Sequence, residues 1–339
     1  MKMALTLARK GQGKTSPNPC VGSVIVKNGR LLGQGWHRQA GQAHAEIEAL
    51  RDARRKGHTV KGSTVYVTLE PCCTHGKTPP CTEALIQEKV ACVVVAATDP
   101  NPCHTGRAYP LLRKAGIQVV TGVLAGEAEH LNRSFNHWIS TGQPWVIAKA
   151  ALSVDGKLTR PKGQGVWLTG EKARRDVHKL RSHCDAILVG AGTARTDNPR
   201  LTVRTGGKSV KQPWRVVLTR SGKFPKPLHL LTDGHSSRTL IYQNKTWKQV
   251  LQDLGKKGVT RLLVEGGAGI FRDLAGKKLI NEAVLYFAPL NFQGHSQQSK
   301  LVDASILLQL SLKETVITKL GPDLKVQGLV ASNPQPETL

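Results

Sequence analysis

Residues 69–81 read LEPCCTHGKTPPC, and the triplet HAE stands upstream of them at residues 44–46. His44 opens a segment with helical spacing, Cys72 follows an apolar strand-like run, and Cys81 begins another helical segment. A catalytic zinc ion takes three protein ligands and keeps a fourth position open for water. One imidazole and two thiolates supply three ligands, so we expect a layered α/β domain that holds zinc on His44, Cys72 and Cys81.

Glu46 stands two residues after the expected imidazole ligand, beside the metal but not bound to it. Zinc lowers the pKa of its water from about 15.7 towards 7. A neighbouring carboxylate can take that proton and return it to a leaving amine. The order H-x-E, P-C and then C is typical of zinc deaminases that act on amino-substituted pyrimidine-type rings. Glu46 is therefore the candidate catalytic acid/base.

The cysteine spacing leaves two alternatives open. Cys72 and Cys81 are separated by eight residues, where the usual deaminase motif has two. Cys73 is an alternative ligand, although Cys72 lies directly after the proline that ends the strand. His75 is an alternative fourth ligand that would close the site, but a closed site leaves Glu46 beside the metal without a role.

Length and composition indicate a two-domain intracellular protein. The chain has 339 residues and 39% hydrophobic content, which is enough for two domains with their own cores. It has no run of about 18 apolar residues, so we expect no membrane span. The seven cysteines are odd in number and no convincing secretory signal precedes them, so we expect a cytoplasmic location with free thiols.

The formal net charge of +26 is unusually high. Lysine and arginine are spread over both halves, there is no RGG tract or basic arm, and aromatic residues make up only 4% of the chain. Nucleic-acid binding is one interpretation of the charge. The other is an enzyme that handles phosphorylated ligands and carries many solvated lysines. We expect a phosphorylated small-molecule substrate and no nucleic-acid partner.

The pattern of elements predicts two α/β domains. Residues 23–33 form a hairpin signal, because two apolar runs are joined by Asn-Gly. Strand and helix signals then alternate through residue 142, which predicts a helix–sheet–helix layered domain. The pattern restarts at residue 143 and continues to 331, and the Pro-rich residues 332–339 are expected to be a disordered tail. Strands of the second domain are expected at 145–150, 186–189, 214–218, 239–242, 261–264 and 283–287, with a helix at 171–182.

Two glycine-rich turns predict a nucleotide site in the second domain. Residues 265–269 read EGGAG, follow the strand at 261–264 and precede a helix that begins near Ile270. Backbone amides and a helix N-terminus at such a turn can bind a pyrophosphate. Residues 190–193 read GAGT and end another strand. Neither turn is a G-x-G-x-x-G fingerprint, so a standard Rossmann domain does not follow, and each alone also fits a plain tight turn.

Taken in order, the motifs resemble those of the bifunctional riboflavin-biosynthesis deaminase/reductases, over about residues 1–330. Single motifs are moderately specific, and their order along two domains is highly specific. The motifs are TSPNPCVG at 15–22, GWH at 35–37, HAE at 44–46, LEPC at 69–72, HGKTPPC at 75–81, DPNP at 99–102, KAALSVDGK at 149–157, GAGT at 190–193, DNPRLTVR at 197–204 and VEGG at 264–267.

The resemblance implies a cytidine-deaminase-like three-layer domain at 1–142, followed by a dihydrofolate-reductase-like α/β domain at 143–331. It implies that the first domain, with one zinc ion, deaminates 2,5-diamino-6-ribosylamino-4(3H)-pyrimidinone 5′-phosphate by hydrolysis. The second domain would then reduce the ribosyl group of 5-amino-6-(5-phosphoribosylamino)uracil to ribityl with NADPH. Members of the family are often oligomeric, so a homo-oligomer is also an expectation.

The resemblance assigns roles to individual residues. It implies that His44, Cys72 and Cys81 bind zinc, that Glu46 is the acid/base and that Cys73 is a bystander. The positions that match NADPH contacts are Ala151, Trp167, Thr193, Asp197, Gly267, Ala268, Gly269, Ile270, Phe271, Arg272 and Asp273. The positions that match substrate contacts are Gly165, Arg181, Leu201, Arg204 and Glu265.

Three positions depart from the family's pattern. Many members have a histidine where this chain has Thr74, and here a histidine follows at position 75. Val154 replaces a leucine in the Ser-Leu-Asp-Gly signature, in which Asp155 is expected to hold a turn. Thr219 stands where a strand-ending aspartate is usual, which bears on the contact with the cofactor ribose.

Two other functions remain to be weighed. The charge and the His-x-Glu site are compatible with an RNA-directed zinc deaminase, but the long cysteine gap and the second nucleotide-binding half argue against it. A non-catalytic, zinc-stabilised nucleic-acid-binding protein would not need Glu46 or an open fourth position at the metal.

Overall fold

The computed structural model divides the chain into two compact units, one formed by Met1–Gly142 and one that begins at Gln143. Each unit has its own hydrophobic core. The expected tail at 332–339 and the candidate residue Gly165 lie outside the described residues. The residues that the structure describes are 1–75, 79–161, 164, 167–204, 211–224, 227–292 and 302–331.

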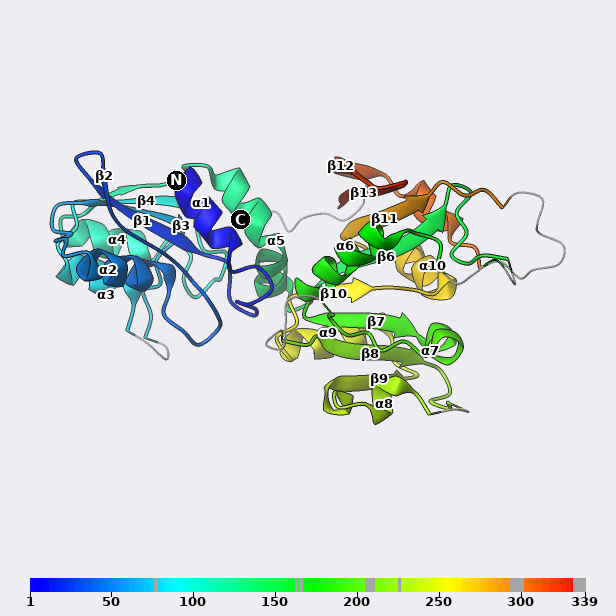
Figure 1. Cartoon of the computed structure of the whole chain (residues 1–339). Helices are drawn as coiled ribbons and strands as arrows, with labels where there is room; N and C mark the ends of the chain where they lie inside the picture. The colour runs from blue at the N-terminus through cyan, green and yellow to red at the C-terminus, as the bar shows by residue number, and fades with distance from the viewer. Residues whose placement is uncertain are drawn as a thin grey trace. The chain divides into compact units, whose positions relative to one another are not determined.

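The first unit is a five-stranded sheet in the order β2-β1-β3-β4-β5, with helices on both faces (Figure 1). The β1–β2 and β1–β3 pairs are antiparallel, and β3, β4 and β5 are parallel. The strands are β1 (Gly22–Lys27), β2 (Arg30–Trp36), β3 (Thr64–Leu69), β4 (Cys92–Ala97) and β5 (Gln118–Val120). The helices are α1 (Lys2–Arg9), α2 (Ala45–Arg55), α3 (Cys81–Gln87), α4 (Ala108–Lys114) and α5 (Ala125–Thr141).

Successive side chains of β1 pack against helices on opposite faces of the sheet, which gives the unit three layers. Val24 packs in a cluster with Ala4 and Leu7 of α1, whereas its neighbour Ile25 packs in the main core with Ala49 of α2. Successive strand residues point to opposite faces of a sheet, so α1 and α2 cover opposite faces. The expected helix–sheet–helix arrangement is therefore confirmed.

The hairpin predicted at 23–33 is also confirmed. Asn28 and Gly29 join β1 and β2 with φ values of 50° and 73°. Two central residues with positive φ are what a type I′ turn requires, and its twist matches that of the flanking strands.

Two glycines of β2 let α2 lie directly on the strand. A Cβ atom added to Gly33 would lie 2.3 Å from the carbonyl oxygen of Ala49, and one added to Gly35 would lie 2.5 Å from its nitrogen. No side chain fits at either position without moving the helix. Because His44 is the N-cap of α2, this contact also fixes where His44 stands.

We expect Gly33→Ala to destabilise the first unit by about 1–3 kcal/mol, because the added methyl overpacks the α2–β2 contact. The shift of α2 should also weaken zinc binding. Urea unfolding and competition with a chelator measure the two effects. Gly126→Ala is the matched control, since a Cβ there meets no heavy atom within 4 Å. A Gly33→Ala protein that matches wild type in both measurements would contradict this account of the packing.

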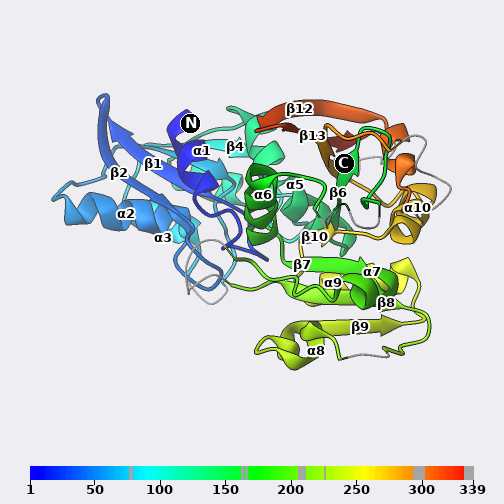
Figure 2. The ribbon, with the colours of Figure 1, turned by 45° about the vertical axis from the view of Figure 1, so that its right-hand side comes forward.

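The second unit is an eight-stranded sheet in the order β12-β13-β11-β6-β10-β7-β8-β9. Figure 1 labels β11, and Figure 2 shows β7, β8 and β9 side by side. Strands β11, β6, β10, β7, β8 and β9 are parallel, and β13 and β12 continue the sheet antiparallel. The strands are β6 (Trp145–Ser153), β7 (Ala186–Gly190), β8 (Trp214–Thr219), β9 (Thr239–Gln243), β10 (Arg261–Val264), β11 (Glu282–Ala288), β12 (Leu312–Leu320) and β13 (Asp323–Val330). The helices are α6 (Glu171–Ser182), α7 (Ala191–Asp197), α8 (His229–Thr232), α9 (Trp247–Lys256) and α10 (Ala268–Gly276), with 3-10 turns η1 (Ser236–Arg238) and η2 (Ser305–Gln309).

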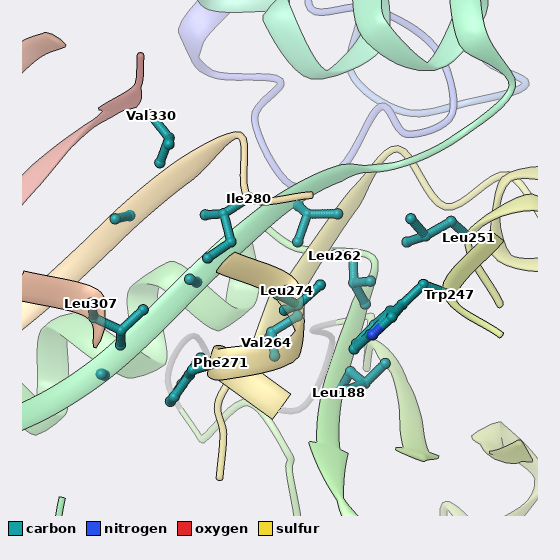
Figure 3. Packing of buried hydrophobic residues seen from close by; sticks show 14 of the residues in the cluster. Leu188, Trp247, Leu251, Leu262, Val264, Phe271, Leu274, Ile280, Leu307 and Val330 are labelled. Atoms are coloured by element: carbon teal, nitrogen blue, oxygen red, sulfur yellow. The ribbon is translucent and has the colours of Figure 1, made fainter. Parts of the chain in front are cut away.

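Hydrophobic clusters lie on both faces of this sheet. On one face Trp247 of α9 and Phe271 of α10 pack with Leu188 and Val264 of the strands (Figure 3). On the other face, residues of α6 and α7 pack in a separate cluster. Because the central strands are parallel, their carboxyl ends meet at one edge, where ligands of open α/β sheets bind.

The elements expected in the second unit are present, with differences at their ends. All six predicted strands and the helix at 171–182 are confirmed. The helix expected near Ile270 begins two residues earlier, at Ala268. Among the described residues, no helix has the length and apolar character needed to cross a membrane.

Candidate metal centre and nucleotide cleft

Three elements of the first unit bring one nitrogen and two sulfurs together. His44 caps the N-terminus of α2, Cys72 follows β3 and Cys81 is the first residue of α3. The Nδ1 atom of His44 lies 3.4 Å from the Sγ atom of Cys72 and 3.4 Å from that of Cys81. Among the described residues, this is the group of His, Cys, Asp and Glu whose ligand atoms all lie within 4.8 Å of one another.

The spacing of these atoms fits a tetrahedral zinc ion. Zinc–nitrogen bonds of about 2.0–2.1 Å and zinc–sulfur bonds of about 2.3 Å place nitrogen and sulfur about 3.5 Å apart at a tetrahedral angle. The backbone N–H of Cys81 donates to Cys72 Sγ over 3.3 Å, which supports a thiolate there. An imidazole with two thiolates is a donor set that suits zinc.

The two alternative ligands lie outside this group. Cys73 is next to Cys72 in sequence, but its sulfur does not join the cluster of ligand atoms. The His75 side chain is exposed, and its Nε2 atom lies 3.0 Å from Oε1 of Glu83. In the described part of the chain, no fourth protein ligand completes the group, which leaves a position for water.

Glu46 lies in the first turn of α2 and is almost fully buried. Its carboxyl group interacts electrostatically with Cys72 and His44, so it stands beside the metal position. Burial raises the pKa of Glu46 to about 7, mainly because a charged carboxylate loses its hydration. A carboxyl group with such a pKa can both accept and return a proton near neutral pH.

His37 packs against the metal ligand His44 and contacts Asn18. The sequence analysis assigned no role to either His37 or Asn18. The His37 ring packs edge-on against His44, with 5.5 Å between ring centroids. Its Nδ1 atom lies 3.1 Å from the Ala43 carbonyl oxygen, and its Nε2 atom lies 3.1 Å from the Asn18 side-chain nitrogen. Burial lowers the pKa of His37, which keeps the ring neutral. The ring can then donate to Ala43 and accept from Asn18, which orients the Asn18 amide. In the sequence, Asn18 lies in the motif TSPNPC and His37 in the motif GWH, and these two motifs were the signal that could have identified the pair.

Glu70 of the LEPC motif has a structural role. Its buried carboxylate accepts three backbone hydrogen bonds of 2.9–3.2 Å. The donors are the amides of Asp99, Gly106 and Ala108. Glu70 therefore ties the DPNP segment and the start of α4 to the end of β3, next to the cysteine ligand.

We expect zinc binding to release about two protons at pH 7, because ligands must be deprotonated to bind metal. The hydrogen bond with Cys72 raises the pKa of His44 to about 9, and the contact with Cys72 together with burial raises that of Cys81. Both carry protons at pH 7. The hydrogen bond from Cys81 lowers the pKa of Cys72 to about 4, so Cys72 is already ionised.

Titration calorimetry in buffers of different ionisation enthalpy counts these protons. Zinc affinity should rise roughly a hundredfold per pH unit around pH 7. Above about pH 9 it should rise about tenfold per pH unit, because His44 is then neutral while Cys81 still carries its proton. Cys73→Ser should release the same number of protons as wild type. Release of fewer than one proton would contradict the ligand assignment.

The second unit contains a cleft of about 2310 Å³ at the carboxyl ends of its parallel strands. Pockets for one small ligand usually measure about 300–1,000 Å³, so this cleft has room for a cofactor and a substrate together. Of the candidate residues, those that line it are Ala151, Trp167, Arg181, Thr193, Asp197, Leu201, Arg204, Glu265, Gly267, Ala268, Gly269, Ile270, Arg272 and Asp273.

Phe271 differs from the other candidate cofactor contacts. Its side chain is fully buried in the hydrophobic core and does not line the cleft. The other six positions of 267–273 line the cleft, so the contact of Phe271 with the cofactor stays a prediction. Gly165 lies outside the described residues, so its expected contact with substrate stays a prediction.

The two glycine-rich turns lie against each other in the cleft. The amide of Gly190 donates to the Gly266 carbonyl over 2.8 Å. A Cβ atom on Gly190 would lie 2.9 Å from Cγ1 of Ile270, and one on Gly267 would lie 3.1 Å from Oγ1 of Thr193. Gly267 is the N-cap of α10 and carries no side chain, so its backbone can approach a phosphate closely.

Arg181 and Glu265 form a bidentate ion pair in the cleft. Arg181 Nε lies 2.7 Å from Glu265 Oε1, and Nη2 lies 2.6 Å from Oε2. Burial alone would raise the pKa of Glu265, but the charge and hydrogen bonds of Arg181 outweigh it and hold the pKa at about 2. Glu265 is therefore ionised and acts as a hydrogen-bond acceptor at any pH of biological interest.

Two family descriptions match the chain. The RibD C-terminal domain matches residues 144–326, and the cytidine and deoxycytidylate deaminase zinc-binding region matches residues 1–97. The riboflavin biosynthesis protein RibD of Bacillus amyloliquefaciens is 38% identical, over 97% of this chain and 95% of the relative. The protein of the same name from Aquifex aeolicus is 36% identical, over 96% of each.

Solved structures agree with these matches. The structure of RibD from Acinetobacter baumannii has a TM-score of 0.85 and 35% identity, and the match covers 97% of each chain. A diaminohydroxyphosphoribosylaminopyrimidine deaminase/5-amino-6-(5-phosphoribosylamino)uracil reductase from Thermotoga maritima has a TM-score of 0.86 and 32% identity, over 98% of this chain and 97% of that one. The expected order of a cytidine-deaminase-like and a dihydrofolate-reductase-like domain is therefore confirmed.

Proposed function

Because the chain belongs to the RibD family of bifunctional deaminase/reductases, we propose how its own residues divide the two reactions. The protein is an enzyme of riboflavin biosynthesis with a zinc-binding deaminase domain and a reductase domain that uses NADPH. It deaminates 2,5-diamino-6-ribosylamino-4(3H)-pyrimidinone 5′-phosphate and then reduces the ribosyl group of 5-amino-6-(5-phosphoribosylamino)uracil. The match over nearly the whole chain disfavours the RNA-directed and non-catalytic alternatives.

We assign the deaminase to residues 1–142 and the reductase to residues 143–331. We also propose a cytoplasmic enzyme, which is supported by the free state of all seven cysteines, each of them in the described part of the chain. A homo-oligomer remains part of the proposal, by resemblance to the family alone.

In the deaminase, His44, Cys72 and Cys81 hold zinc, which when bound supplies a Lewis acid that turns water into a nucleophile near neutral pH. Glu46 takes a proton from the attacking water on its carboxylate and passes it to the departing amino nitrogen. The single observation that carries this assignment is the buried Glu46 carboxyl group beside an open three-ligand cluster.

In the reductase, the cleft residues position the two ligands, and NADPH when bound supplies the hydride. The Gly190 and Gly267 turns suit the cofactor's pyrophosphate. Arg204 is exposed in the cleft and has a guanidinium fork suited to the substrate phosphate. Arg181 is engaged with Glu265 and holds that carboxylate in place. Glu265 then accepts a hydrogen bond from the substrate.

The zinc-loaded protein should release one ammonia and oxidise one NADPH per molecule of the diaminopyrimidinone phosphate. Ammonia release should continue when NADPH is left out, because deamination comes first. Ammonia without NADPH oxidation would remove the reductase assignment, and failure of both reactions would remove the proposed function.

Glu46→Gln tests the acid/base within the same assay. It should keep zinc but lower ammonia release at least about a hundredfold, since general acid/base catalysis contributes about 10²–10⁴-fold. It should still oxidise NADPH when the deaminated intermediate is supplied. Glu48→Gln, on the same helix, should match wild type. Full ammonia release by Glu46→Gln would show that the role of Glu46 is wrong.

A further inference from the structure

One face of α6 borders the cleft of the second unit. Arg174, Val177, His178 and Arg181 recur at the spacing of a single helix face, and all four line the cleft. In the proposed function, Arg181 holds Glu265 in place. His178 lies about one turn before Arg181, and the proposed function gives it no role.

The two arginines of this face are already engaged by protein groups. The Nη1 atom of Arg174 donates to the Thr169 carbonyl over 2.8 Å, and its guanidinium lies 5.5 Å from the centroid of the Trp167 ring. Arg181 forms its bidentate pair with Glu265. Among the four side chains of this face, the imidazole of His178 is therefore the polar group that remains available to a ligand.

The two ring nitrogens of His178 differ in their surroundings. The Nδ1 atom is buried and has no hydrogen-bond partner among the described residues. The side chain as a whole is half-buried and lines the cleft, so Nε2 is the nitrogen that a ligand in the cleft can reach. Buried polar atoms of native proteins are rarely left unpaired, and such atoms are often found at functional sites.

Charged groups of its own helix and of three other segments surround this imidazole. Burial lowers the pKa of His178. The positive charges of Arg181, Arg204 and Lys149 lower it further, and Glu265 acts in the opposite direction. The ring is therefore mostly neutral at pH 7, with one N–H donor and one acceptor nitrogen.

The surrounding charges place the proton of the neutral ring on Nε2. A lone pair on the buried Nδ1 atom is stabilised among positive charges. An N–H group at Nδ1 would instead bring its own positive end into the same field and would have no acceptor. His178 thus offers an Nε2–H donor in a positive environment, which suits an anionic oxygen.

The phosphate of the reductase substrate is the anionic group that fits this donor. Arg204, which the proposed function pairs with that phosphate, is one of the charges that act on His178. A phosphate has three strong acceptor oxygens, so it can accept from a guanidinium and from an imidazole at the same time. The cofactor's pyrophosphate is assigned to the Gly190 and Gly267 turns, which leaves the substrate phosphate for this face of α6.

We infer that the Nε2–H group of His178 binds the 5′-phosphate of the reductase substrate together with Arg204. The inference rests on the reductase of the proposed function and adds a phosphate-binding residue to its substrate site. Adjacent turns of α6 then have separate tasks, since Arg181 holds the Glu265 carboxylate and His178 holds the phosphate.

Two substitutions test which nitrogen of His178 is used. In His178→Gln the side-chain amide nitrogen can stand where Nε2 stands in histidine, whereas in His178→Asn it can stand only where Nδ1 stands. Calorimetry on the zinc-loaded full-length protein with NADP⁺ measures the binding of 5-amino-6-ribitylaminouracil with and without its 5′-phosphate.

His178→Asn should weaken binding of the phosphorylated product about 10- to 100-fold, as expected for a lost hydrogen bond to a charged group. His178→Gln should stay within about threefold of wild type, because it keeps a donor at the same place. Binding of the product without phosphate should stay within about twofold in both variants, which also shows that they are folded.

Two further variants are matched comparisons. Arg204→Gln should also weaken the phosphorylated product selectively, by about 10- to 100-fold. Lys179→Gln removes a positive charge from an exposed position on α6 that does not line the cleft, and it should bind both forms of the product like wild type.

A selective loss in His178→Asn, with binding retained in His178→Gln, supports the inference. It is overturned if His178→Asn loses nothing, if it loses both forms of the product equally, or if the two variants lose the phosphorylated product equally. In each of these cases, NADPH oxidation by wild type with the deaminated intermediate leaves the reductase assignment standing. Absence of that oxidation overturns the reductase assignment and this inference together.

Discussion

One nitrogen and two sulfurs must come within about 3.5–3.8 Å of each other to hold a tetrahedral zinc ion, and they come from three separate elements. His44 is placed by the N-terminus of α2, Cys72 by the end of β3 and Cys81 by the start of α3. Two contacts help to hold the ligand atoms at these distances. One is the packing of α2 on the glycines of β2, and the other is the set of hydrogen bonds from the segment before α4 to Glu70. The position of Glu46, and with it the deaminase chemistry, follows from the same constraint.

The second unit must hold two anionic ligands, and its described residues include no group of metal ligands like that of the first unit. Parallel strands bring their carboxyl ends to one edge, and the two glycine turns leave backbone groups there free of side chains. The buried Arg181–Glu265 pair keeps a negative acceptor ionised in this cleft, where most of the other charged side chains are positive. The high net charge of the chain suits an enzyme that handles phosphorylated ligands.

Much of the fold could be predicted from local signals. The Asn28-Gly29 turn and the apolar runs of the parallel strands are set by short-range chemistry, and the structure has them as expected. The sequence analysis predicted neither β12 nor β13. Strand β12 gives no strand signal, because its sequence does not alternate apolar and polar residues and most of it is exposed.

The functional sites likewise contain residues that a local motif identifies and residues that only the fold brings together. The zinc ligands lie in a dense motif, whereas the pairing of His37 with Asn18 depends on a contact between residues 19 apart in sequence. Phe271 was expected to contact cofactor because the family positions were carried over as a continuous run. Periodicity of a helix buries some members of any such run, and Phe271 is one of them.

X-ray absorption at the zinc edge of the fully loaded protein tests the central claim most directly. Two sulfur ligands at about 2.3 Å and two nitrogen or oxygen ligands at about 2.0–2.1 Å are predicted. Of the latter two, one is the His44 nitrogen and the other is a water oxygen. The same spectrum is predicted for Cys73→Ser and for His75→Ala. Three sulfur ligands, or a second imidazole that disappears in His75→Ala, would contradict an open His44–Cys72–Cys81 centre.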